Sequence, residues 1–292
     1  MKKFLFTGCG TAIATPFNKD GVNLEEFKKL IEFQIQNKVD SIIVCGTTGE
    51  SSTMTKEEKM ATIKCAVETV DGRIPVIAGT GGNCTRDVIE NSKMAESLGV
   101  DGLLIVTPYY NKTTQAGLIT HYKEICKNTS LPIILYSVQS RTGVNIEPKT
   151  CLELSKLENI VAIKEASGNI SQIAEIAQLC GDNLTIYSGN DDQILPILSL
   201  GGKGVISVLS NVKPKLTHNI VQNFLDGNIE KAKELQLKAI PLIKALFSEV
   251  NPIPVKAALN ILGYNFGVPR LPLVPMTEKG VENLKNELLR LD

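Results

Sequence analysis

Short apolar runs rich in β-branched residues recur along the chain and alternate with segments of helical periodicity. These runs are continuous, which is typical of parallel strands covered on both faces, whereas a half-exposed strand alternates apolar and polar residues. Strands are expected at 10–15, 41–44, 75–78, 102–106, 133–136, 161–164, 184–188 and 204–207. Eight strands with intervening helices predict an α/β fold and favour a (β/α)8 TIM barrel over a doubly wound sheet.

Helix signals fill the segments between these runs. Asn23, with Glu26 three residues later, can cap one helix, and Asn169 can cap another. After about residue 211 the pattern predicts more helices than a barrel needs, at 230–240, 255–262 and 278–289. We therefore expect residues 1–210 to form the barrel that carries the active site. Residues 211–292 would supply the last barrel helix and a helical C-terminal extension packed on the barrel.

Composition narrows the class of protein. The 292 residues contain 31 basic and 31 acidic side chains, so the net charge is zero and a nucleic-acid partner is not indicated. No apolar run is long enough to cross a bilayer, and the apolar stretch at 4–6 is too short for a signal peptide. Seven scattered cysteines and two histidines lack metal-ligand spacing, which predicts reduced thiols, no metal site and a cytoplasmic location.

Polar residues gather where the expected strands end. In a TIM barrel the chemistry is found at the carboxyl ends of the strands. Clusters follow the strands here at 46–51, 79–83, 107–111 and 188–190, whereas the amino ends are ordinary connectors. All candidate groups are therefore expected on one face of the barrel.

Lys164 is the most informative of these residues because it ends the apolar run 160–163. Burial removes hydration from an ammonium group and disfavours its charged form. A lysine that is partly neutral is a nucleophile that forms Schiff bases with carbonyl substrates. A strand-end lysine that reaches solvent, or that pairs with Glu165, would explain the same segment without chemistry.

The neighbouring candidates also have two interpretations each. Beside a neutral lysine, the phenol of Tyr136 can carry protons, although a core aromatic residue would fit the same position. Thr47 and Thr48 can present hydroxyls to an anion or simply shape their loop. Arg141 can bind a carboxylate through two parallel hydrogen bonds, or it can form a surface ion pair.

Five separated motifs together resemble the dihydrodipicolinate synthase family, within the pyruvate-dependent class I aldolases. They are Gly46-Thr-Thr-Gly-Glu-Ser51, Tyr136 followed by Arg141-Thr-Gly, Ile163-Lys-Glu-Ala-Ser-Gly168, Gly204-Val-Ile-Ser207 and Asn251-Pro-Ile-Pro-Val-Lys256. The likeness covers essentially the whole chain. The paired threonines and the Arg-Thr-Gly segment look like the synthase rather than its sibling aldolases.

The resemblance implies a Schiff base between Lys164 and pyruvate, whose enamine adds to L-aspartate 4-semialdehyde to give 4-hydroxy-tetrahydrodipicolinate for lysine and diaminopimelate biosynthesis. It implies no cofactor and no metal. Thr47, Tyr136 and Tyr110 would form a proton relay, with Tyr110 reaching into a neighbouring subunit of a homotetramer built from tight dimers. The implied substrate-binding residues are Thr48, Arg141, Gly189 and Ile206.

Two departures from the family pattern carry expectations. The family usually reads Asn-x-Pro-x-Arg after its tyrosine, but Ser137 and Gln139 stand here, so the pose of Arg141 is less constrained. The resemblance also implies a regulatory pocket at Ser51, Ser52, Lys56, Lys59, Asn83, Asp87 and Tyr109. Lys56 and Lys59 replace two histidines of lysine-sensitive relatives, which predicts weak inhibition by L-lysine or none.

Other functions remain compatible with the sequence. A sibling aldolase of the N-acetylneuraminate lyase or 2-keto-3-deoxy sugar acid type would share the fold and the Schiff base, which do not fix the aldehyde acceptor. A non-catalytic barrel that binds a keto acid is the third hypothesis. Lys164, Tyr136, Thr47 and Arg141 argue against it, because a binding protein has no need of a proton relay.

Overall fold

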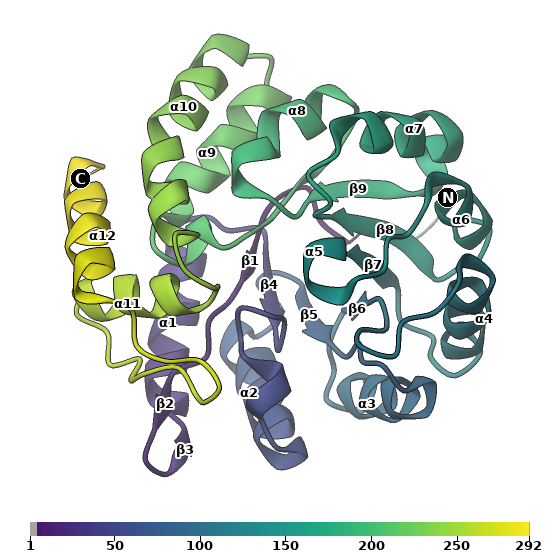
Figure 1. The fold of residues 1–292 in the computed structure, drawn as a ribbon, viewed down its shortest axis with the longest axis horizontal. Coiled ribbons are helices and arrows are strands. Elements are labelled where there is room, and N and C mark those ends of the chain that lie inside the picture. The colour runs from purple at the N-terminus through teal and green to yellow at the C-terminus, as the bar shows by residue number, and fades with distance from the viewer. Residues whose placement is uncertain (1–4, 292) are drawn as a thin grey trace.

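The computed structural model describes residues 5–291, and within them eight parallel strands close into a barrel. Helices surround the strands, as Figure 1 shows, and the predicted (β/α)8 fold is confirmed. Around the barrel the strand order is β1-β10-β9-β8-β7-β6-β5-β4. The strands are β1 (Gly8–Ala12), β4 (Ser41–Val44), β5 (Val76–Gly79), β6 (Gly102–Val106), β7 (Ile133–Ser137), β8 (Ile160–Glu165), β9 (Thr185–Ser188) and β10 (Gly204–Ser207).

The first strand lies earlier than the expected 10–15. Barrel closure decides this, because Gly8 pairs with Gly204 of β10 while Ala12 is the last residue to pair with β4. The amide of Ile13 still donates to Ile43 O of β4, but the amide of Ala14 donates to a side chain, Asn211 Oδ1, at 2.9 Å. The apolar run is thus longer than the strand it contains.

A small antiparallel hairpin follows and was not expected from the apolar pattern. It consists of β2 (Phe17–Asn18) and β3 (Gly21–Val22). The backbone amide of Asp20 donates to Asn18 Oδ1 at 2.9 Å, which stabilises the turn. Two-residue strands carry too little periodicity to be recognised in a sequence.

The barrel helices follow their strands in order. They are α1 (Leu24–Gln36), α2 (Lys56–Val70), α3 (Thr85–Ser97), α4 (Gln115–Cys126), α5 (Gln139–Thr142), α6 (Pro148–Leu154), α7 (Ile170–Cys180), α8 (Ile194–Ser199) and α9 (Pro214–Leu225). Both expected caps are present: Asn23 Oδ1 accepts from the amide of Glu26, and Asn169 Oδ1 from that of Gln172. The carboxylate of Glu26 accepts from the backbone amide of Asn265, and this hydrogen bond connects α1 to the C-terminal segment.

Three further helices form the C-terminal extension, namely α10 (Ile229–Leu246), α11 (Ile253–Ile261) and α12 (Glu278–Arg290). In Figure 1 they lie together at one side of the barrel, and α10 packs against α9. α10 runs six residues past the expected 240 and contains Pro241. Leu242, Ile243 and Leu246 are buried there, and this apolar face continues the helix past the proline.

A layer of apolar side chains fills the inside of the barrel. Phe6 stacks on Tyr187 with ring centroids 4.3 Å apart, next to buried residues such as Ile43, Ile77 and Ile134. The inside of this barrel is therefore a packed core, as is typical of the fold. No helix among residues 5–291 is long and apolar enough to span a membrane.

Candidate active site

Lys164 lies near the end of β8 with its side chain inside the barrel and only 5% of its surface exposed. Its Nζ atom lies 4.5 Å from the centroid of the Tyr136 ring, on the neighbouring strand β7. Glu165 points the other way, because successive strand residues face opposite sides. Its carboxylate accepts from the backbone of Ser167 at 2.7 Å and from Gln172, and burial raises its pKa. Lys164 therefore neither reaches solvent nor pairs with Glu165.

The strand ends enclose a cavity of about 200 Å³ beside Lys164. Among the described residues, its two cationic side chains are Lys164 and Arg141, and no carboxylate lines it. The other lining residues are Ala12, Ile43, Gly46, Thr47, Thr48, Leu104, Tyr136, Val138, Ser140, Ala166, Gly189, Asn190, Val208, Phe247 and Asn251. We call this space the inner cavity. Its net positive lining suits a small anionic ligand with a carbonyl group within reach of Lys164.

The two threonines belong to a tight loop after β4. The amide of Gly49 donates to Gly46 O and that of Glu50 to Thr47 O, which gives two overlapping turns. Glu50 has a φ of 53°, a left-handed conformation that L-residues rarely adopt. Its buried carboxylate accepts from Lys256 Nζ at 2.7 Å and from the backbone of Arg270 at 2.9 Å. The C-terminal extension thus anchors the loop that carries both threonines.

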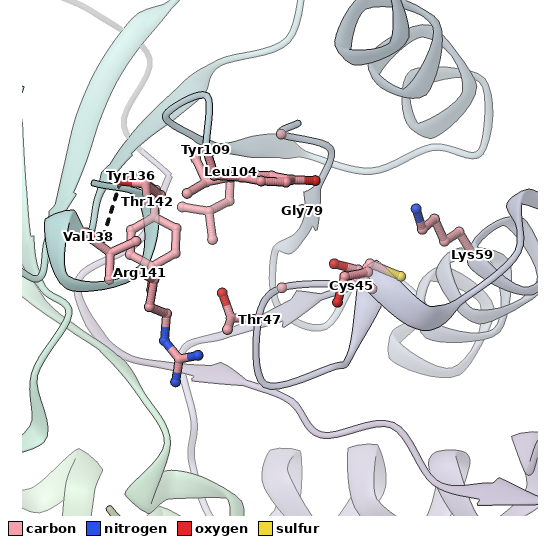
Figure 2. A pocket seen from close by; sticks show the side chains of 15 residues that line it. Cys45, Thr47, Lys59, Gly79, Leu104, Tyr109, Tyr136, Val138, Arg141 and Thr142 are labelled. Carbon is pink, nitrogen blue, oxygen red and sulfur yellow. Dashed lines mark hydrogen bonds between the residues drawn. The ribbon is translucent and has the colours of Figure 1, made fainter. Parts of the chain in front are cut away.

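Arg141 lies in α5, and Figure 2 shows its side chain beside Tyr136 and Thr47. Nη2 donates to the main-chain oxygen of Asn251 at 3.3 Å, and no carboxylate among residues 5–291 pairs with the guanidinium. Two hydrogen bonds hold this loop, which lacks the family proline. Ser137 Oγ donates to Asn145, while the amide of Arg141 donates to Val138 O. The surface ion pair considered for Arg141 is therefore absent from the described residues.

Two other expected substrate-binding residues differ in their surroundings. Gly189 lines the inner cavity, whereas Ile206 is 1% exposed, lies in the apolar layer inside the barrel and does not line the cavity. After β10, the backbone amides of Val208 and Leu209 donate to the buried carboxylate of Asp191. Burial raises the pKa of Asp191, and its two hydrogen bonds fix the segment that follows β10.

Tyr110 does not join the other candidates within the chain. It lies on the loop after β6, 92% exposed, with a left-handed φ of 69°. Hydrogen bonds from Asn83 to Tyr109 O and from Asn111 to Asn83 O hold this loop in shape. One chain therefore brings Thr47, Tyr136 and Lys164 together and leaves Tyr110 projecting from the surface.

An outer cavity, also of about 200 Å³, adjoins the inner one and shares Thr47, Tyr136 and Arg141 in its wall. Four of the seven expected regulatory residues line it, namely Ser51, Ser52, Lys59 and Tyr109. Lys56, Asn83 and Asp87 do not, although Asn83 touches the loop of Tyr109. In Figure 2 Lys59 lies at the opposite end of this space from Arg141. The regulatory role of these residues stays a prediction.

Sequence reasoning assigned no role to Asn251 or Phe247, which both line the inner cavity. Asn251 Nδ2 donates to Thr48 Oγ1 at 3.1 Å across 203 residues of sequence. In the sequence, only its place in the motif 251–256 pointed to Asn251, and nothing pointed to Phe247. Among residues 5–291 no group of three or more histidine, cysteine or acidic side chains could hold a metal ion.

Comparison with known proteins places this geometry in a family. The sequence matches the Dihydrodipicolinate synthetase family over residues 5–290. It is 60% identical to a 4-hydroxy-tetrahydrodipicolinate synthase of Caldicellulosiruptor saccharolyticus, over 98% of this chain and 97% of that protein. The fold is similar to dihydrodipicolinate synthase of Thermotoga maritima, with a TM-score of 0.96, 47% identity and 98% of both chains covered. It is also similar to the chloride-inhibited synthase of Acinetobacter baumannii complexed with pyruvate, with a TM-score of 0.95, 42% identity and 97% and 98% of the chains covered. The chain belongs to the dihydrodipicolinate synthetase family.

Proposed function

We propose that the protein condenses pyruvate with L-aspartate 4-semialdehyde through a Schiff base on Lys164, giving 4-hydroxy-tetrahydrodipicolinate. The observation that carries this proposal is the burial of Lys164 in a cavity that no carboxylate of the described residues lines, with its Nζ atom 4.5 Å from the centroid of the Tyr136 ring. Full-length relatives named 4-hydroxy-tetrahydrodipicolinate synthase support the same reaction.

The first half of the reaction forms the imine. The carboxylate of pyruvate enters a cavity whose charged side chains are both cationic, and the hydroxyl of Thr48 donates to it. The lone pair of Lys164 Nζ adds to the ketone carbon, and the resulting carbinolamine loses water to give a protonated imine. Tyr136 and Thr47 both line the inner cavity, and they transfer the protons that this dehydration requires.

The second half forms the carbon–carbon bond. The protonated imine draws electrons from the neighbouring methyl group, which loses a proton and becomes an enamine carbon. That carbon adds to the aldehyde carbon of the semialdehyde, whose oxygen takes up a proton from the Tyr136 relay. Arg141, free of any protein carboxylate among the described residues, binds the carboxylate of this second substrate. The amine of the new chain then displaces Lys164 and closes the six-membered ring.

Assembly is part of the proposal. Tyr110 is almost fully exposed and held in a left-handed conformation, which suits a side chain inserted into a neighbouring subunit. We place the protein in the cytoplasm as a homotetramer of two tight dimers in which Tyr110 completes the relay of its partner. Tyr110→Phe would then lower turnover without changing the borohydride trapping of pyruvate.

Covalent trapping tests the proposed function. Sodium borohydride added with pyruvate should inactivate the protein and attach one reduced pyruvate unit at Lys164, as peptide mass spectrometry would show. Lys164→Arg should abolish labelling, because a guanidinium stays protonated and forms no imine. Lys256 is the other buried lysine among residues 5–291 and serves as an internal control. A label on Lys256, or none at all, contradicts the mechanism, and product analysis with sugar-derived aldehydes separates the sibling aldolases.

A further inference from the structure

We propose that Asn251 is a positioning residue that turns the hydroxyl of Thr48 into a fixed hydrogen-bond donor for the carboxylate of the keto acid. This inference rests on the proposed function and adds a residue from the C-terminal extension to the site. Asn251 would act on the substrate through Thr48.

Asn251 occupies the junction between α10 and α11, 6% exposed, in the wall of the inner cavity. Its side-chain Nδ2 donates to Thr48 Oγ1 at 3.1 Å, and its main-chain oxygen accepts from Arg141 Nη2 at 3.3 Å. One residue therefore contacts both side chains that we propose as carboxylate binders. The extension thus links the loop of Thr48 to the segment of Arg141.

The chemistry of the two groups sets the direction of the hydrogen bonds. A threonine hydroxyl has one hydrogen to donate and two lone pairs that accept, whereas an amide NH2 group only donates. Thr48 Oγ1 must therefore accept from Asn251, and its own hydrogen remains available. Thr48 has no other hydrogen-bond partner among the described residues, and it lines the inner cavity. The hydrogen is thus left for a ligand that accepts, which a carboxylate always does.

Two further observations indicate that the arrangement serves the site rather than stability alone. Asn251 Oδ1 is buried and has no hydrogen-bond partner among residues 5–291, which is uncommon in folded proteins and carries a cost. The loop of Thr48 is also anchored independently by the ion pair between Glu50 and Lys256, so stability does not require the Asn251 contact to hold this loop. The additional hydrogen bond from Asn251 to Thr48 therefore orients one hydroxyl group.

A double-mutant cycle between Asn251 and Thr48 tests this role through the KM for pyruvate. Thr48→Val removes the donor and should raise this KM about tenfold or more, the usual effect of losing a hydrogen bond to a charged group. Asn251→Ala frees the hydroxyl to rotate and should raise KM about fivefold, with a smaller change in kcat. In the Thr48→Val background, Asn251→Ala should add less than twofold, because the hydroxyl it orients is gone.

Asn251→Asp nearly preserves the volume of the side chain and should reverse the hydrogen bond to the hydroxyl of Thr48. A carboxylate only accepts, so Thr48 would donate to it and turn its hydrogen away from the substrate. Its KM for pyruvate should exceed that of Asn251→Ala. This variant also keeps the test decisive if the alanine variant does not fold.

Asn260 is the matched control, because it is also an asparagine of the extension but lies outside both cavities. Within residues 5–291 its side chain donates to Gly267 O and accepts from the amide of Phe266, and it has no other hydrogen bond. Asn260→Ala should lower thermal stability and leave the KM for pyruvate unchanged. Equal KM changes at Asn251 and Asn260, or multiplicative effects of Asn251→Ala and Thr48→Val, would overturn the inference. Wild-type protein that is not labelled by pyruvate and borohydride would instead overturn the proposed function.

Discussion

Replacing Lys256 with methionine should destabilise the protein severely, although the residue lines neither the inner nor the outer cavity. Lys256 and Glu50 form an ion pair whose side chains are 0% and 1% exposed, with Nζ and Oε1 2.7 Å apart. Lys256 Nζ also lies 4.3 Å from the centroid of the Phe17 ring. Methionine keeps most of the volume and removes the charge, so Glu50 keeps only the hydrogen bond from the backbone of Arg270.

The magnitude follows from the distance and the burial. Unit charges 2.7 Å apart attract by about 6 kcal/mol at an effective dielectric constant near 20, and the desolvation of both groups offsets much of that gain. This desolvation is also the main reason that the pKa of Lys256 is lowered. Removing one partner leaves the other charge buried without compensation, which costs about 3–5 kcal/mol. Lys256→Met should therefore cost far more than the pair contributes net.

Thermal unfolding at one protein concentration and pH 7 measures this effect. At about 2 °C per kcal/mol, a midpoint lower by roughly 6–10 °C is expected for a chain of this size. The double variant Lys256→Met with Glu50→Gln should recover part of the loss, because it leaves no buried charge unpaired. Lys231→Met is the control, since its pair with Glu234 is 52% and 61% exposed and should contribute under about 1 kcal/mol. A Lys256→Met midpoint within 2 °C of wild type, or strictly additive losses in the double variant, would refute the reasoning.

Three other predictions concern catalysis, regulation and pH. Tyr136→Phe should reduce turnover about 10²–10⁴-fold while fold and assembly are retained, and wild-type turnover would show that the phenol is only a core group. L-lysine should inhibit weakly or not at all, because Lys59 lines the outer cavity. Its ammonium group repels the ammonium group of a bound L-lysine about 6 Å away by roughly 2–3 kcal/mol. Half-inhibition below a millimolar in initial-rate titrations would contradict this. The hydrogen bond from Arg270 holds the pKa of Glu58 below its usual value. The pair therefore stabilises the fold at pH values above the unfolded-state pKa of Glu58, and this stabilisation is lost as the pH falls through the folded-state pKa. Glu58→Gln should thus lower the thermal midpoint at pH 7 and match wild type in strong acid, and an equal deficit at both pH values would rule this out.

The sequence alone determined the architecture because the relevant signals are local. Continuous apolar runs indicate strands covered on both faces, and eight of them alternating with helices define a barrel. The caps at Asn23 and Asn169 depend on residues three positions away, and both are present. Lys164 was identified because an ammonium at the end of an apolar run is unusual in itself, and the barrel rule placed Thr47 and Tyr136 on the same face.

Only the tertiary structure decided how the site is held together. Asn251 meets Thr48 across 203 residues and Lys256 meets Glu50 across 206, contacts that exist only because the extension packs back over the barrel. Closure of the barrel likewise set the start of β1 at Gly8 by pairing it with β10. No local sequence pattern predicts such contacts, since each depends on the position of a distant segment in the folded chain. The sequence therefore predicts on which face of the barrel candidate residues lie, whereas the partners that orient them depend on long-range packing.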